Sequence, residues 1–266
     1  MSGSRSLKLT VWALVWFDLI FLAVPTVIIL IASFTASEII RFPPEGLSLR
    51  WYESILVEGG FREAFWRSFV VSVICTALAV PIGTLAAIAL ARYRLAFATT
   101  IQIYLLLPFT IPLIVSGLGL MLVFGEARVL GNLWPVGVAT CAINIPFMIW
   151  SVGSSVNALD PDLEHAAANC GAPPLLTFAT VTLPAVAPGV ITGALLMFIL
   201  AFNEFIVSLM LVDARIVTLP VLIYNSIRSV ITPDLAAVSV VYILVAFIAI
   251  RVLDRLVGLE IFLKSR

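Results

Sequence analysis

Long runs of apolar residues fill most of the chain and are separated by shorter polar stretches. A helix needs about 20 mainly apolar residues to cross the hydrocarbon core of a bilayer. Six stretches reach that length: Val11 to Ala32, Phe69 to Ala91, Ile101 to Phe124, Leu133 to Val152, Val186 to Val212 and Leu235 to Leu253. The pattern predicts an all-α, polytopic membrane protein with six transmembrane helices and with both ends of the chain on one side of the membrane.

One polar segment, Asp160 to Pro184, interrupts this pattern and is built like two short helices. Asp160 followed by Pro161 is typical of a helix start, because the Asp side chain accepts orphan backbone N–H bonds and proline gives up a donor that had no partner. Gly171 stands where a left-handed C-cap is expected. Two apolar stripes at helical spacing accompany these signals, Leu163, Ala166, Ala167 and Cys170 in the first helix and Leu175, Phe178 and Ala179 in the second.

A small, alanine-rich face lets another surface approach closely, so we interpret this segment as a docking element between two spans. The alternative is an amphipathic loop that lies on the lipid headgroups. Residues 160–184 contain no Lys or Arg, which counts against that alternative, because basic side chains are what would hold such a loop on anionic lipid.

The same segment resembles the cytoplasmic EAA loop of ABC importer permeases. That signature reads Glu-Ala-Ala, three residues, Gly, nine residues and Ile-x-Leu-Pro. The residues in register here are Ala166, Ala167, Gly171, Val181, Leu183 and Pro184, and His165 stands where the family usually has Glu. The resemblance implies that a coupling loop of about residues 153–185 docks on an ATPase through Glu164, His165, Ala166, Ala167, Gly171, Leu183 and Pro184.

The histidine at the usual glutamate position leads to a sharper expectation. An imidazole there should weaken a charge contact with the ATPase, or replace it with a hydrogen bond that depends on pH near neutrality. Glu164 points about 100° away on a helix and cannot simply substitute. We therefore expect Ala166, Ala167 and Gly171 to carry docking by their shape, with His165 as a tuned contact.

Further motifs are similar to the spermidine/putrescine branch of that family and extend the resemblance from about Ser48 to Ile250. They are Ser48-Leu49-Arg50-Trp51-Tyr52, Pro81-Ile82-Gly83-Thr84-Leu85-Ala86-Ala87, Leu107-Pro108 with Pro112 and Gly117, and Phe198-Ile199-Leu200-Ala201-Phe202-Asn203-Glu204-Phe205. The resemblance implies a type I ABC importer permease fold in a single domain over residues 1–266, with a core of about 65–255. It also implies a polyamine, or a related small polar amine or amino-acid-like molecule, as the solute.

Partners and location follow from the same resemblance. Such permeases work with two copies of a cytoplasmic ATP-binding subunit, a second and related permease subunit in a heterodimer, and a solute-binding protein outside the membrane. The chain is expected to cross the bacterial inner membrane several times, in contact with lipid and with cytoplasmic termini. Lys and Arg are divided almost equally between the two sides, so the resemblance, more than the positive-inside rule, sets this orientation.

Composition excludes several other classes of protein. The 266 residues are 62% hydrophobic and 11% charged, whereas soluble domains are about 25% charged. A formal net charge of zero leaves no basic footprint for nucleic acid. Cys75, Cys141 and Cys170 lack metal-ligand spacing and are interpreted as small buried hydrophobes. His165 is the only histidine, which removes His-pair metal sites and His-based catalytic triads.

Polar groups inside apolar spans are costly, so they are expected to face a cavity, a partner or one another. Asn203 and Glu204, near the middle of the fifth predicted span, are the best candidates for the translocation path or its gate. The alternative for them is a hydrogen bond between helices that fixes packing. Asp18 is a further candidate that we expect to be structural, and Asn144, beside Pro146, is expected either to satisfy carbonyls freed by the proline or to line the path.

The sequence carries no motif for hydrolysis. It has no Gly-x-x-x-x-Gly-Lys-Ser/Thr phosphate loop, so ATP and Mg²⁺ are expected in the partner ATPase and no cofactor in this chain. The leading hypothesis is therefore a non-enzymatic permease subunit of an ATP-driven, binding-protein-dependent importer. The alternative is a self-sufficient secondary transporter or channel with Glu204 and Asp18 as ion or proton sites, which would not explain the spacing from Gly171 to Pro184.

Overall fold

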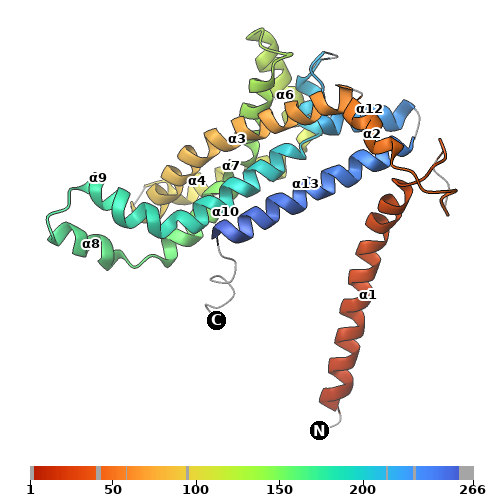
Figure 1. Ribbon diagram of the computed structural model, residues 1–266. Helices are drawn as coiled ribbons and strands as arrows, with labels where there is room; N and C mark the ends of the chain where they lie inside the picture. The colour runs from red at the N-terminus through yellow and green to blue at the C-terminus, as the bar shows by residue number, and fades with distance from the viewer. Residues whose placement is uncertain are drawn as a thin grey trace. The chain divides into compact units, whose positions relative to one another are not determined.

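The computed structural model describes residues 3–39, 43–57, 59–93, 96–213, 215–229 and 232–257. Within these ranges the regular elements are helical (Figure 1). In chain order they are α1 (Gly3–Ala32), α2 (Arg50–Val57), α3 (Gly59–Arg92), α4 (Ala98–Tyr104), α5 (Leu107–Thr110), α6 (Leu113–Glu126), α7 (Leu133–Ala158), α8 (Pro161–Asn169), α9 (Pro174–Thr177), a π-helical turn (Phe178–Thr182), α10 (Leu183–Phe202), α11 (Ile206–Leu211), α12 (Leu219–Ser229) and α13 (Pro233–Val257).

The helices divide between two compact units. The first takes its described residues from Met1–Arg62 and Ile223–Val245, and in it the segment after α1 is fastened to α2. Trp51 Nε1 donates to Thr35 O at 2.8 Å, and the hydroxyls of Ser33 and Tyr52 are 2.7 Å apart. The second unit takes its described residues from Glu63–Leu222 and Ala246–Arg266, and it contains most of α3 and all of α4 to α11.

The predicted spans correspond to helices, with differences at two breaks. Among the described residues, four helices are long and apolar enough to cross a membrane: Lys8–Ala32, Gly60–Arg92, Leu133–Ala158 and Pro174–Phe202. These contain the first, second and fourth predicted spans and the larger part of the fifth. The sixth lies in α13, where Pro233–Val245 is a shorter apolar helix.

The third predicted span, Ile101 to Phe124, is not one continuous helix, and the structure corrects that expectation. Thr100–Thr110 and Leu113–Glu126 are bent by 99° relative to each other. Ile111 is extended, with φ −92° and ψ 128°, and Pro112 follows as the N-cap of α6. Proline disfavours helical geometry in the residue before it and brings no N–H for the helical ladder, so the helix ends at Thr110 and restarts after Pro112.

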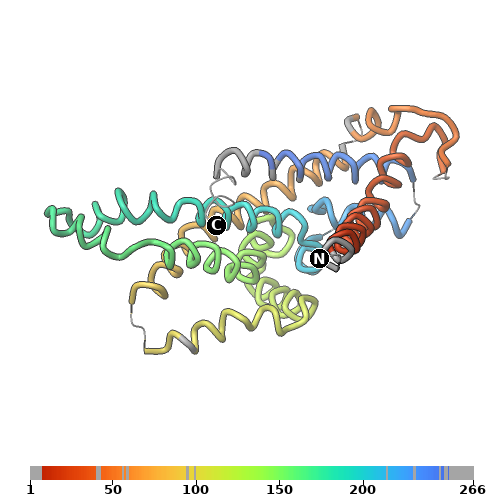
Figure 2. The backbone as a smooth tube through the Cα atoms, turned by 90° about the horizontal axis from the view of Figure 1, so that it is seen from below, coloured from red at the N-terminus to blue at the C-terminus, as the bar shows by residue number. Residues whose placement is uncertain are grey.

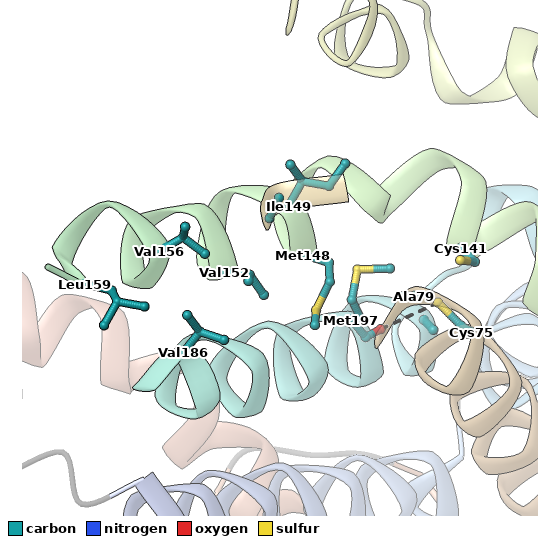
Figure 3. Close-up of a cluster of buried hydrophobic side chains, with 12 residues drawn as sticks. Cys75, Ala79, Cys141, Met148, Ile149, Val152, Val156, Leu159, Val186 and Met197 are labelled. Atoms are coloured by element: carbon teal, nitrogen blue, oxygen red, sulfur yellow. Dashed lines mark hydrogen bonds between the residues drawn. The ribbon is translucent and has the colours of Figure 1, made fainter. Parts of the chain in front are cut away.

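A cluster of buried side chains holds α3, α7 and α10 together (Figure 3). Val152 and Val156 of α7 face Val186 of α10, and Met148 and Met197 interlock farther along the same two helices. Cys75 of α3 lies with its sulfur 4.0 Å from Met197 O, and Cys141 is also buried. Cys170 is exposed, which corrects its interpretation as a buried hydrophobe. These three helices therefore form one packed bundle.

The α8–α9 hairpin lies at one end of this bundle. It connects α7 to α10, which run side by side, and extends beyond their ends in both views (Figures 1 and 2). The fold thus presents residues 160–177 as a projecting end of the second unit.

Candidate functional site

Helix α8 begins and ends with the capping residues that the sequence predicts. Asp160 accepts a hydrogen bond from Asp162 N at 3.0 Å, and Pro161 occupies the first helical position. After the helix, Gly171 has a φ of +86°, in the left-handed region that favours glycine. Its N–H donates to Ala168 O at 2.9 Å, and Ala172 N donates to Ala167 O at 3.1 Å. This bonding pattern is a Schellman motif, so the length and direction of α8 are fixed by its own sequence.

The second half of the hairpin is not the separate short helix that the sequence predicts, because it runs directly into α10. α9 covers only four residues and continues through the π-helical turn into α10, so that Pro174–Phe202 is a single apolar helical rod of 29 residues. Leu183 N donates to Phe178 O, five residues back. This wider turn lets Pro184, which has no N–H to donate, follow without ending the helix.

Glu164, in the first turn of α8, points back toward the other helices of its own chain. Its Oε1 accepts a hydrogen bond from Thr182 Oγ1 at 2.6 Å, and its Oε2 lies 3.1 Å from Nε of Arg92, the last residue of α3. The latter is an ion-pair contact without the alignment of a hydrogen bond. Arg92 Nη2 also donates to Leu159 O, at the end of α7, at 3.3 Å. We call Arg92, Glu164 and Thr182, with the Leu159 carbonyl, the hairpin clamp.

The other predicted residues of the coupling loop lie mainly on the surface. His165, Ala166, Gly171, Leu183 and Pro184 are exposed, and Ala167 is half-buried. Exposed leucines accompany them, Leu163, Leu175 and Leu176, of which Leu175 is 78% exposed. Exposed apolar side chains on a hairpin with fixed caps are typical of a surface that binds a partner.

Sequence reasoning did not identify two members of the clamp. In the sequence, Arg92 is one of several basic residues that flank the spans, and Thr182 lies between Val181 and Leu183 without being one of the residues in register with the loop signature. One signal could have indicated the pair. A basic residue ends the span, where the helix dipole favours a positive charge, and the first helical turn of the loop is acidic. The pairing itself joins residues far apart in the sequence, so no local pattern indicates it.

Asn203 and Glu204 lie in a break between helices, which corrects the expectation that one span runs through them. α10 ends at Phe202 and α11 begins at Ile206. Asn203 Nδ2 donates to Ile199 O at 2.7 Å, and Glu204 Oε1 accepts from Val207 N at 3.0 Å, so that Glu204 caps the first turn of α11. Asn203 is exposed and Glu204 half-buried. Irregular backbone within a membrane protein is tolerated where protein covers it or where it lines a water-filled cavity.

Aromatic rings of α3 and α10 gather just before this break, around the buried ring of Phe202. Phe65 of α3 meets Phe202 edge to face at 5.5 Å between ring centroids, and Phe198 stacks on Phe202 at 5.9 Å. Phe69 contacts Phe198 at 5.6 Å and stacks on the exposed Trp66. The helix break with Glu204 thus follows directly after a row of ring faces.

The remaining candidates occupy simpler environments. Asn144 is buried in α7, where its Nδ2 donates to Thr140 O at 3.1 Å. Pro146 frees the carbonyl of Ala142, four residues before it, so the Asn144 bond goes to a different carbonyl from the one expected. Asp18 is an exposed residue of α1, in the first unit. Within the described residues, no group of three or more His, Cys, Asp or Glu side chains could hold a metal ion.

A cleft of about 690 Å³ opens beside the clamp end of α3. Ala87, Leu90 and Ala91 of α3 form one wall, and α4 and α7 complete it with polar groups at Gln102, Ser154 and Asn157. The end of α3 therefore forms both part of the clamp and part of a cleft wall.

Comparison with known proteins shows that the sequence matches the model of one protein family. The model described as "Binding-protein-dependent transport system inner membrane component" matches residues 79–259, more than half of the chain. The chain is 28% identical over 243 residues to the putrescine transport system permease protein PotI of Escherichia coli strain K12, with 86% of this chain and 85% of PotI covered.

Two further relatives cover most of their own length. The spermidine/putrescine transport system permease protein PotC of Haemophilus influenzae is 25% identical over 237 residues, which cover 89% of this chain and 91% of PotC. A putative 2-aminoethylphosphonate transport system permease protein, PhnV of Salmonella paratyphi A, is 25% identical over 240 residues, with 90% of each chain covered.

Solved structures share the fold at lower identity. A chain of a bacterial ABC transporter involved in the import of the acidic polysaccharide alginate superposes with a TM-score of 0.75 at 15% identity, over 96% of this chain and 98% of that chain. A chain of the MetNI methionine ABC transporter in an inward-facing conformation gives a TM-score of 0.59 at 19% identity, over 78% and 96%. These likenesses concern the fold, which is that of type I ABC importer permeases.

Proposed function

The chain belongs to the family of binding-protein-dependent transport system inner membrane components, and we propose that it forms one half of a permease pair that imports a small amine, with spermidine or putrescine as the leading solutes. It is an integral membrane permease of the ABC importer family, and hydrolysis of ATP belongs to a separate subunit in our proposal. ATP and Mg²⁺ would then bind that subunit, and this chain would hold no cofactor.

The docking surface for the ATPase is the α8–α9 hairpin. The single observation that carries this proposal is a projecting hairpin in which the length of α8 is fixed by caps at Asp160 and Gly171, and in which Leu163, His165 and Ala166 are exposed. A rigid apolar projection fits a groove on a soluble partner, because burial of its leucines gains free energy at roughly 25 cal/mol for each Å² removed from water. Two ATPase copies would serve two permease subunits.

The other components follow the family pattern. We propose a second, related permease subunit in a heterodimer, a solute-binding protein on the outer side of a bacterial inner membrane, and cytoplasmic termini. The hairpin and the termini would then face the same compartment as ATP. The single permease domain, with a core of about 65–255 and a coupling loop of about 153–185, is part of this proposal.

An amine as the solute is supported by the relatives and by the polar break. Putrescine, spermidine and 2-aminoethylphosphonate, which name the solutes of the relatives, all carry a primary amine that is protonated near neutral pH. Glu204 supplies a carboxylate inside an apolar region, and the partly exposed rings of Phe65 and Phe198 pack on Phe202, two residues before it in the chain. A carboxylate beside aromatic faces is the environment that stabilises an ammonium group away from water. Asn203 and Glu204 are therefore our candidates for the translocation path.

Purification of the tagged chain from its native membrane tests the assembly. Mild detergent extraction followed by mass spectrometry should recover a P-loop ATPase and a second permease. Recovery of the chain alone, with transport persisting in liposomes without ATP, would instead support a secondary transporter. For the solute, the reconstituted complex with its binding protein should take up labelled putrescine or spermidine in an ATP-dependent manner. Excess 1,4-butanediol, which matches putrescine in length but lacks its amines, should not compete.

A further inference from the structure

We propose that Arg92 is a positioning residue that couples movement of the docking hairpin to α3. This spanning helix is not a neighbour of the hairpin in the chain. This inference rests on the docking role proposed above. It concerns how a displacement of α8 enters the bundle, whatever the solute.

Chain connectivity alone delivers such a displacement to only two spanning helices. The hairpin follows α7 and precedes α10, so both helices share its backbone. α3 ends at Arg92, which is 67 residues before Leu159 in the sequence. The Arg92 side chain makes polar contacts from the end of α3 to Glu164 of the hairpin and to the Leu159 carbonyl just before it.

The geometry of the clamp suits a rigid transmission. One guanidinium contacts both sides of the Asp160 turn, with Nη2 3.3 Å from Leu159 O at the end of α7 and Nε 3.1 Å from Glu164 Oε2 in α8. The second oxygen of Glu164 is held by Thr182, which is buried in the π-helical turn. A guanidinium is planar and its donors are fixed in direction, so α8 cannot tilt against α7 without breaking a contact or carrying Arg92 with it.

The surroundings make these contacts more costly to lose than those of an ordinary surface pair. The side chains of Arg92 and Glu164 are only 21% and 23% exposed. When one partner of a poorly solvated pair is removed, the remaining charge is left without compensation. Each charge also favours its own helix dipole, because Arg92 closes α3 and Glu164 lies in the first turn of α8.

Movement of α3 would have a direct consequence for a cavity. Ala87, Leu90 and Ala91, in the last turns of α3 before Arg92, form a wall of the 690 Å³ cleft opposite α4 and α7. A clamp that carries the end of α3 with the hairpin therefore changes the shape of that cleft whenever the hairpin is displaced.

The test uses the full complex in proteoliposomes and measures three quantities: solute imported per ATP hydrolysed, the amount of ATPase that co-purifies, and the thermal unfolding midpoint. Glu164→Gln and Arg92→Gln should each lower import per ATP by about tenfold while the ATPase still co-purifies. The double exchange Arg92→Glu with Glu164→Arg should recover a large part of the loss. Recovery should be incomplete, because the exchanged charges oppose both helix dipoles.

Arg67→Gln is the matched control. Arg67 also lies in α3 and pairs with a glutamate, Glu63, at 2.9 Å, but both residues belong to the same helix, one turn apart. Its import per ATP should equal that of the wild type. Arg92→Lys keeps the charge and loses the planar fork, so it should fall between the wild type and Arg92→Gln even if Arg92→Gln folds poorly.

Three results would overturn the inference, and each points elsewhere. Wild-type import per ATP in both single variants would show that the clamp transmits nothing. Loss of the ATPase from the Glu164→Gln complex, at an unchanged unfolding midpoint, would mean that Glu164 contacts the ATPase directly. A double exchange no better than the weaker single variant would remove the pairing as the cause. If no ATPase co-purified with the wild-type chain, that result would instead contradict the proposed function.

Discussion

Gly189 of α10 lies directly against Ser151 of α7, whose hydroxyl donates to the Gly189 carbonyl oxygen at 2.9 Å. A Cβ atom at position 189 would stand 2.8 Å from the Ser151 backbone oxygen, which cannot rotate away. One helical turn later, Gly193 lies against the side chain of Met148. Small residues spaced by four let two helices approach closely in a membrane, where packing rather than the hydrophobic effect holds them together.

Gly189→Ala should therefore destabilise the protein. The added methyl group forces α7 and α10 apart, and overpacking of this kind typically costs about 1–3 kcal/mol. The measurement is the thermal unfolding midpoint in detergent, which should fall. Gly153→Ala is the matched control, because Gly153 is also helical and a Cβ there meets nothing within 4 Å. An unchanged midpoint for Gly189→Ala would contradict the close contact.

Gly171→Val should weaken ATPase association. A β-branched residue is strained at a φ of +86°, and losing the left-handed cap redirects the chain after α8 at a cost of about 1 kcal/mol or more. Gly171→Asn should retain more association than Gly171→Val, because asparagine tolerates this conformation better. The quantity to measure is the ATPase retained per permease on a tagged column. Equal retention by the two variants would show that the cap does not matter for docking.

His165→Ala tests whether the exposed imidazole tunes the docking contact. If His165 makes a hydrogen bond to the ATPase that depends on pH, the substitution should flatten the pH profile of solute-stimulated ATP hydrolysis near neutrality. The side chain is exposed, so the substitution should leave the unfolding midpoint of the permease unchanged. The proposal fails if the rate and its pH profile match those of the wild type in the reconstituted complex.

Glu204→Gln separates charge from capping at the helix break. Glutamine keeps an oxygen that can accept the hydrogen bond from Val207 N, whereas Glu204→Ala removes both the acceptor and the charge. If the charge holds the ammonium group of the solute, Glu204→Gln should slow import by about tenfold, equivalent to about 1.4 kcal/mol, at an unchanged unfolding midpoint. Preserved rate and solute affinity in Glu204→Gln would remove Glu204 from the translocation path and leave it a structural cap.

Local signals in the sequence predicted the features that local chemistry determines. The apolar runs identify the spanning helices, and Asp160, Pro161 and Gly171 set the limits of α8 through backbone hydrogen bonds a few residues away. The spacing from His165 to Pro184 was enough for the family resemblance that the comparison of residues 79–259 supports.

Local patterns did not predict features that depend on competition between alternative hydrogen bonds or on residues far apart in the chain. The run from Ile101 to Phe124 is apolar throughout, so hydropathy alone does not reveal that Pro112 divides it. Asn203 and Glu204 were recognised as polar, but whether a helix continues past them depends on competing local bonds to Ile199 O and Val207 N. The Arg92–Glu164 pair joins residues far apart in the chain and became visible only in three dimensions.

The glycine contact also limits where a solute can travel. Beside Gly189 and Gly193 the two helices lie so close that an added Cβ atom would stand within 3 Å of α7, and the Ser151 hydroxyl already contacts the Gly189 carbonyl oxygen, which leaves no width there for an ammonium group. The two helices consequently present a sealed surface to any permeating molecule. A route through the complex must run along other faces of this subunit.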